Sequence, residues 1–223
     1  MDSSRNSSLS LYKGLPVVHS YRRHLLDKAD GPERTAGITK VILDGMGPNV
    51  KPRGVYSISC KFDICEIFVQ TSDDLLRCAQ WQIHSVQLDM TGERAYTKGS
   101  ISSAAHAGIY FTIDMDGYIN PATKRMWIYN VRNLLRLCSK KNILVVYSAD
   151  RMNEEEILQI FQKFKIKRRV AVGFYTINME RMLVTAAMKK YAYKGSFVPI
   201  EENETDFKRM VYRATKPLKS IKG

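Results

Sequence analysis

The chain lacks a long apolar segment, a secretory signal and a disulfide pattern, and each absence argues against a class of protein. No run of residues approaches the length needed to cross a bilayer, and the opening MDSSRNSSLS has no apolar stretch. The four cysteines, Cys60, Cys65, Cys78 and Cys138, show no CxxC spacing and stand beside apolar residues. We therefore expect reduced thiols in the cytosol or nucleus, and no metal site.

Sequence motifs for common enzyme chemistry are also missing. The chain has no P-loop, no GxGxxG and no GxSxG, which argues against nucleotide-binding loops and against a serine hydrolase. An EF-hand at Asp114 and Asp116 fails because no glutamate follows at the required distance. We accordingly expect no cofactor.

Acidic residues are in deficit. The 35 lysines and arginines outnumber the 22 aspartates and glutamates, which gives a formal charge of +13 and a pI near 9.6. Such an excess favours anionic partners, namely nucleic acid, a nucleocapsid or an acidic membrane surface, over a small-molecule substrate. The hydrophobic content of 44% excludes a wholly disordered protein.

The periodicity predicts a single compact α+β domain, with a mainly antiparallel sheet flanked by helices. We expect a disordered Ser-rich tail over 1–14, a core over 15–214 and a basic tail over 215–223. Apolar spacing predicts helices over 17–29, 72–84, 121–138, 153–164 and 178–191. Alternating or short apolar runs predict strands over 38–43, 55–64, 86–90, 109–115, 143–147 and 170–177, and an exposed loop over 91–108.

The stretch from Val55 to Trp81, VYSISCKFDICEIFVQTSDDLLRCAQW, contains the most specific pattern. Its first half alternates apolar and polar residues as a half-buried strand does, and a helix capped by Thr71 or Ser72 follows. The same order occurs in vesiculovirus-type matrix proteins, where an alternating strand leads to a Phe, then a Ser-Asp pair, then seven residues and then a Trp. The residues at the matching places are Tyr56, Ile58, Cys60, Phe62, Phe68, Ser72, Asp73 and Trp81.

In this segment, about an eighth of the chain, the sequence resembles a rhabdovirus matrix protein. The resemblance implies a non-enzymatic structural protein beneath the viral envelope, at the inner membrane face and in the host cytoplasm. Its implied partners are the viral ribonucleoprotein and RNA, an anionic membrane surface, the viral glycoprotein tail and further copies of itself. None of the seven prolines is followed by another proline, so the Pro-Pro-x-Tyr budding motif of many matrix proteins is missing. The resemblance also makes Trp81 a core residue.

Clustered cations are the candidate binding residues. A first cluster, Lys163, Lys165, Lys167, Arg168 and Arg169, stands between an expected helix and an expected strand. Cations at a helix C-terminus are favourable, but five of them in seven positions without an acid repel one another unless an anion is near.

Two further groups of cations follow. A second cluster interleaves Lys189, Lys190 and Lys194 with tyrosines, whose rings could stack on bases, lie among lipid headgroups or pack on the core. After Asp206 the chain has cations and no acid: Lys208, Arg209, Arg213, Lys216, Lys219 and Lys222.

A different function is suggested by Asp114-Met115-Asp116-Gly117, which follows an apolar strand. This tetrad resembles the first motif of haloacid-dehalogenase-type phosphatases, in which the first aspartate attacks phosphorus and the second is a general acid or base. The resemblance would assign phosphate binding to Ser148, stabilisation of the phospho-intermediate to Lys189 or Lys190, and Mg²⁺ binding to Glu201 and Glu202. The same tetrad is ordinary turn chemistry after a strand. We expect Asp114, Asp116, Ser148, Lys190 and Glu202 to converge in space only if the phosphatase hypothesis holds.

Overall fold

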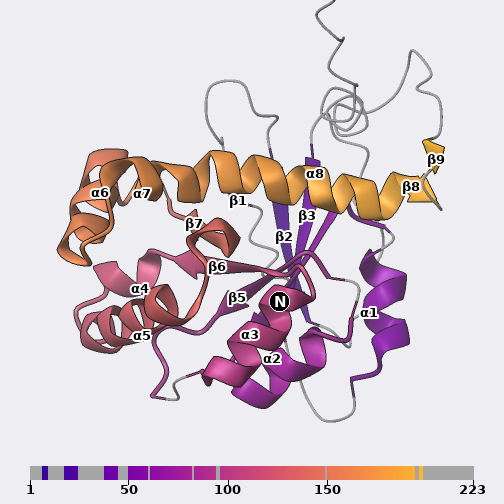
Figure 1. Ribbon diagram of the computed structural model, residues 1–223, viewed down its shortest axis with the longest axis horizontal. Helices are drawn as coiled ribbons and strands as arrows, with labels where there is room; N and C mark the ends of the chain where they lie inside the picture. Colours follow the sequence, from indigo (N-terminus) through magenta and orange to yellow (C-terminus); the bar gives the residue numbers. More distant parts are fainter. Residues whose placement is uncertain are drawn as a thin grey trace, which may run out of the picture.

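Six parallel strands in sequential order form the centre of the fold (Figure 1). The computed structural model describes residues 7–9, 18–24, 38–44, 50–59, 61–81, 83–93, 96–148, 150–193 and 196–197; the side chains discussed below lie between residues 38 and 189. The sheet order is β1-β2-β3-β4-β5-β6-β7, and β1 alone runs antiparallel to its neighbour. The strands are β1 (Ser7–Leu9), β2 (Val18–His24), β3 (Ile38–Asp44), β4 (Ile64–Val69), β5 (Ser85–Leu88), β6 (Tyr110–Asp114) and β7 (Ile143–Val146).

Helices connect the strands from β3 onward. They are α1 (Pro52–Ser59), α2 (Ser72–Cys78), α3 (Lys98–His106), α4 (Asp116–Ile119), α5 (Lys124–Leu137), α6 (Glu154–Lys163), α7 (Arg168–Tyr175) and α8 (Ile177–Tyr191). A 3₁₀ turn over Lys140–Asn142 precedes β7, and a two-stranded ribbon of β8 (Ala192–Tyr193) and β9 (Ser196–Phe197) follows α8. Sequential parallel strands with intervening helices are the arrangement found in βα barrels.

The prediction of one α and β domain with a sheet flanked by helices is confirmed, but the prediction of a mainly antiparallel sheet is wrong. Antiparallel neighbours need only a short hairpin, whereas parallel neighbours need a crossover of a dozen or more residues. Here a helix fills every connection between β3 and β7, so each strand re-enters the sheet at the same edge. The predicted tail boundaries, at 14/15 and 214/215, lie outside the described residues, but Ser7–Leu9 of the expected disordered tail forms strand β1, because its backbone pairs with β2.

Two predicted strands are helices. The expected strand over 55–64 contains α1, which begins at a proline and buries Val55 and Ile58 one turn apart, while Tyr56 is 57% exposed. The expected strand over 170–177 is α7, whose β-branched and aromatic content masked the helical spacing of its buried Ala171, Phe174 and Tyr175. The strand on which the matrix resemblance relied is therefore a helix in its first half.

Two other segments differ from their predicted conformation. The expected helix over 17–29 contains strand β2, which pairs with β3 along its whole length from Val18↔Ile38 to His24↔Asp44. The expected loop over 91–108 contains α3, whose N-cap Thr97 accepts a hydrogen bond from the Ser100 amide. The inner face of α3 consists of small residues and one isoleucine, namely Ser100, Ile101, Ala104 and the partly buried Ala105, so its sequence shows little apolar periodicity.

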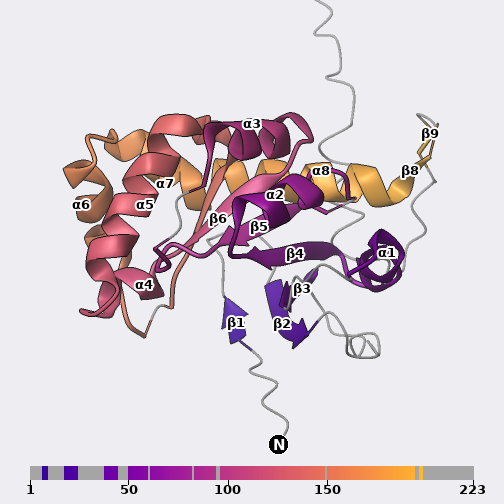
Figure 2. The same ribbon diagram turned by 90° about the horizontal axis from the view of Figure 1, so that it is seen from below.

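The sheet buries both of its faces. On one face, alternate strand residues such as Ile67 and Phe111 pack against α1, α2, α3, α5, α6 and α7 in the main core. On the other face, Ile38, Ile64 and Leu144 pack against α8, which crosses the sheet near the amino ends of the strands (Figure 2). Trp81 belongs to the main core and is 9% exposed, as predicted.

No helix in the described part of the chain is long and apolar enough to cross a membrane. The helices α4, α5, α6 and α7 gather at one end of the molecule, and α1 lies at the other end (Figures 1 and 2). The end formed by α4 to α7 contains the groups considered next.

Candidate nucleic-acid interface

Asp114, Asp116 and Ser148 meet at the carboxyl edge of the sheet. Asp114 ends β6 and pairs with Val146 at the end of β7, two residues before Ser148. The amide of Asp116 donates to Asp114 Oδ1 at 3.0 Å, and Arg151 lies 3.0 Å from Asp116 Oδ2. Three of the five residues of the phosphatase hypothesis therefore converge. They do so at the edge where ligands of parallel α/β sheets bind.

The other two residues do not complete the phosphatase constellation. Lys190 belongs to α8, which crosses the amino ends of the strands, and the neighbouring Lys189 amine lies 3.4 Å from the carbonyl of Ile83, before β5. Glu202 lies outside the described residues. Among the described residues, no group of three or more histidine, cysteine or acidic side chains is arranged to hold a metal ion.

The Asp-x-Asp-Gly tetrad has structural contacts that explain its residues. Asp114 Oδ2 accepts a hydrogen bond from Gln87 at 3.0 Å, and the Asp114 carbonyl accepts one from the Trp127 indole at 2.8 Å. Gly117 lies against the same indole, where an added Cβ would come within 2.5 Å of Trp127 Cδ1. The tetrad thus joins β6 to α5 by a turn in which only glycine fits.

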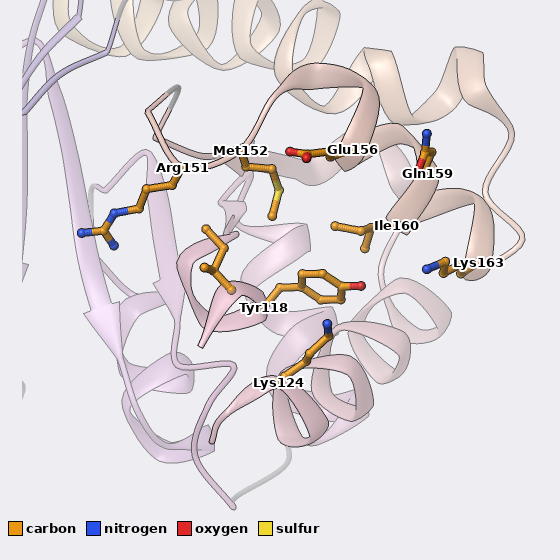
Figure 3. Close-up of a pocket in the computed structure, with 9 residues that line it drawn as sticks. Tyr118, Lys124, Arg151, Met152, Glu156, Gln159, Ile160 and Lys163 are labelled. Carbon is orange, nitrogen blue, oxygen red and sulfur yellow. The ribbon is translucent and has the colours of Figure 1, made fainter. Parts of the chain in front are cut away.

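A pocket of about 280 Å³ lies beside this edge, between α4, α5 and α6 (Figure 3). Its wall contains Tyr118, Ile119, Lys124, Arg151, Met152, Glu156, Gln159, Ile160 and Lys163. The Lys124 amine lies 4.2 Å from the centre of the Tyr118 ring, and Arg151 points away from the pocket toward its partner Asp116. The pocket therefore joins two cations from different helices, Lys124 of α5 and Lys163 of α6, and Lys163 belongs to the first predicted cluster.

The first cluster is exposed, but it connects two helices and not a helix and a strand. All five cations between Lys163 and Arg169 are exposed. Arg168 binds both carboxylate oxygens of Glu155, at 2.8 and 2.7 Å. This hydrogen bonding raises the pKa of Arg168 and lowers the pKa of Glu155. Four cations of the cluster, Lys163, Lys165, Lys167 and Arg169, form no ion pair with described residues.

Lys165 stands where helices usually place glycine. The helix α6 ends in a Schellman arrangement, in which the Ile166 amide bonds the Phe161 carbonyl and the Lys165 amide bonds the Gln162 carbonyl. Lys165 is the residue of left-handed conformation in this motif, with φ of 61°, and the described residues contain no other non-glycine residue with positive φ. A left-handed conformation costs a residue with a side chain roughly 1–2 kcal/mol relative to the right-handed one.

A second basic surface lies on α5, and the periodicity analysis missed it. Trp127, Val131, Leu134 and Leu135 face the core, whereas Arg125, Tyr129, Arg132 and Arg136 form one exposed stripe at spacings of four, three and four residues. Tyr129 is 60% exposed in the middle of the three arginines. The sequence did contain a signal, because no acid occurs between Asp116 and Asp150, where six cations do.

Both basic helices begin against the preference of the helix dipole. The first turns of α5 and α7 contain no acidic residue, although the positive end of a helix favours anions by roughly 0.3–1 kcal/mol each. Instead α5 begins with Lys124 and Arg125, and α7 with Arg168 and Arg169. The pairing with Glu155 explains Arg168. Helix stability does not explain the other three cations, Lys124, Arg125 and Arg169.

The remaining predicted binding residues contribute less to this surface. Partial burial lowers the pKa of Lys189, whose amine lies near the Ile83 carbonyl on the far side of the molecule from the pocket. The side chains of Lys190 and Lys194 lie outside the described residues. So do all the cations that follow Asp206: Lys208, Arg209, Arg213, Lys216, Lys219 and Lys222.

The fold and its basic end define an α/β domain with a cationic surface on α5 and on the turn between α6 and α7. Neither a protein-family model nor a curated protein matches the chain. Among solved structures, it is similar to a chain in the cryo-EM structure of archaeal ribonuclease P with mature tRNA. The two are 11% identical with a TM-score of 0.58, over 75% of this chain and 77% of that one. At this identity the likeness shows a shared fold.

Proposed function

We propose that this chain is an RNA-binding protein and a structural component of a ribonucleoprotein, as its structural likeness to a chain of archaeal ribonuclease P suggests. One observation carries the proposal. The cations of α5 and of the α6–α7 turn are exposed, lie at one end of the molecule and, apart from Arg168, have no ion-pair partner among described residues. Phosphates of an RNA backbone would neutralise them.

The composition of the α5 stripe favours RNA over a lipid surface. Its arginines can donate paired hydrogen bonds to phosphate oxygens, and its exposed Tyr129 presents a ring on which an unpaired base can stack. A helix that inserts into a membrane interface needs a broad exposed apolar face, and the apolar face of α5 is buried in the core.

The matrix-protein hypothesis remains a prediction and shares the RNA partner with this proposal. It differs by requiring anionic membrane and self-association. The phosphatase hypothesis remains a second candidate because Asp114, Asp116 and Ser148 converge, but it needs a lysine that α8 holds at the opposite edge of the sheet.

The test compares two triple variants that each lose three exposed positive charges. Arg125→Gln/Arg132→Gln/Arg136→Gln removes the α5 stripe, and Lys51→Gln/Arg53→Gln/Lys98→Gln removes cations elsewhere on the surface. Binding to a structured RNA is measured by fluorescence anisotropy over a salt series. Each lost phosphate contact reduces the slope of log affinity against log salt by about 0.7–0.9.

We expect the α5 variant to lose about two units of slope and the control to lose far less. Equal losses in both variants would mean that net charge alone drives binding, which would refute the assigned surface. A parallel titration with anionic liposomes separates the RNA proposal from the matrix hypothesis, which requires saturable liposome binding by the wild type.

A further inference from the structure

The pocket between α4, α5 and α6 gathers hydrogen-bond donors, two of which are positively charged amines. Figure 3 shows the Tyr118 hydroxyl pointing toward the Lys163 amine, with the Lys124 amine beneath the ring. The three side chains come from α4, the first turn of α5 and the last turn of α6. The three side chains thus come together only in the folded protein, because they belong to three different helices.

The electrostatics of the pocket favour an anion. Neither Lys124 nor Lys163 forms an ion pair with the described residues, and Arg151 adds a third positive charge that Asp116 balances. Glu156 is the acid in the pocket wall, and its Oε2 is bonded to the Asn153 amide at 2.9 Å in the capping box of α6. The wall therefore keeps a net positive charge and several free donors.

The start of α5 adds to this preference. Thr123 precedes the helix but makes no side-chain cap, and its hydroxyl donates to the Gly117 carbonyl at 2.9 Å. The Lys124 amide donates to the Asn120 carbonyl at 2.9 Å, whereas the Arg125 and Met126 amides have no side-chain acceptor at the N-cap. The positive end of the α5 dipole therefore adds to the charge of Lys124.

We infer that this pocket holds one phosphate group of the bound RNA, contacted by Lys124, Lys163 and the Tyr118 hydroxyl. The inference rests on the proposed function for the source of the phosphate. Lys124 is followed directly by Arg125 of the exposed stripe, so an RNA strand that follows α5 reaches the pocket at the start of the helix. The group can be a terminal monophosphate or an internal diester, which share the same oxygen chemistry.

The first test uses inorganic phosphate and the full chain. Met152 and Ile160 line the pocket, so methyl-labelled methionine and isoleucine report on it in NMR spectra. We expect saturable shifts of these two methyl signals on adding phosphate at constant ionic strength. The shifts should be lost in Lys124→Gln and in Lys163→Gln, and kept in Arg125→Gln and Lys165→Gln, which remove neighbouring charges outside the pocket. Shifts that do not saturate, or that the control variants also lose, would refute the site.

The second test identifies the source of the phosphate. One RNA is prepared in two forms, with a 5′-phosphate and with a 5′-hydroxyl. Each pocket variant is expected to bind an RNA form about tenfold more weakly than wild type if that form places a phosphate in the pocket. This is the loss expected for one charge-assisted hydrogen bond. A loss confined to the 5′-phosphorylated RNA identifies a terminal phosphate, and an equal loss on both identifies an internal one. Unchanged binding of both RNAs by the pocket variants would overturn the inference.

The two proposals fail separately. If the α5 variant loses RNA binding while the pocket variants do not, the proposed function stands and the pocket inference falls. If wild type binds no RNA but shows the saturable phosphate shifts, the anion pocket stands and the RNA proposal falls.

Discussion

The Lys40 amine lies 2.7 Å from Oε1 of Glu66, and both side chains are more than nine-tenths buried. The pair joins β3 to β4 on the face of the sheet that α8 partly covers. The hydroxyls of Ser85 and Thr112 donate to Oε2 at 2.6 and 2.5 Å, so one carboxylate connects four neighbouring strands. A buried charge of this kind is tolerated only because it is paired and hydrogen-bonded.

Breaking this pair should therefore destabilise the fold. Lys40→Met leaves Glu66 charged in the protein interior and is expected to lower the free energy of unfolding by about 3–5 kcal/mol. The double variant Lys40→Met/Glu66→Leu should recover much of this loss, because no uncompensated charge remains. Urea titrations at neutral pH measure both, and a loss below about 1 kcal/mol in the single variant would mean that water reaches the carboxylate.

Removing the exposed ring of Tyr129 should weaken RNA binding without changing its salt dependence. Stacking of a base on an aromatic ring contributes about 1–3 kcal/mol and involves no counterion. Tyr129→Ala should thus reduce affinity for single-stranded RNA about fivefold or more at every salt concentration. Tyr56→Ala, at a similarly exposed tyrosine of α1, serves as the control and should leave affinity unchanged. A changed salt slope in Tyr129→Ala would contradict stacking.

Three cysteines should be almost unreactive in the folded protein. Burial raises the pKa of the Cys78 and Cys138 thiols to about 12, and raises that of Cys65 further. In a Cys60→Ser variant at pH 8, labelling by iodoacetamide should be slower than in urea by roughly a thousandfold, because only the thiolate reacts. The folded pKa exceeds the unfolded one, so stability should also fall as the pH rises above about 8.5. Rapid labelling under native conditions would show that the core around these cysteines opens.

Replacing Asp114 should change the stability of the turn after β6 and should affect no phosphatase activity. We expect wild type to show no Mg²⁺-dependent hydrolysis of a generic phosphate ester, because the lysine required by the phosphatase hypothesis lies on α8 at the other edge of the sheet. In Asp114→Asn the side chain has one acceptor oxygen instead of two, so it can accept from Gln87 or from the Asp116 amide but not from both through separate oxygens. The variant should lower the free energy of unfolding by about 1 kcal/mol, as measured in a denaturant titration. Metal-dependent turnover by wild type that this variant abolishes would establish the phosphatase instead.

The elements that could be predicted from the sequence are those whose own residues contain a clear cap or a clear apolar pattern. Asn153 predicted the start of α6, where the structure shows a capping box with Glu156, and of the two candidate caps for α2, Thr71 or Ser72, the structure uses Thr71. The strands β6 and β7 were found from their apolar runs. In contrast, α3 has too few apolar residues to show a period. Without that helix, the regular alternation of strands and helices that implies a parallel sheet was incomplete.

The site was predictable in part for a similar reason. The cluster around Lys165 was visible because its cations are adjacent in the sequence. The α5 stripe was not found, because its cations are separated by the core residues of the same helix and become neighbours only on its surface. Convergence of Lys124 with Lys163 could not be predicted, since nearly forty residues and the whole of β7 separate them.

At Lys165 the stability of the fold and the positive charge of the surface favour different residues. Glycine at this position would relieve strain of roughly 1–2 kcal/mol and would fit the end of α6 better. It would also remove a positive charge from the turn between α6 and α7. Laboratory selection for heat resistance alone should therefore favour glycine here, and would give a more stable protein with one positive charge fewer in this turn.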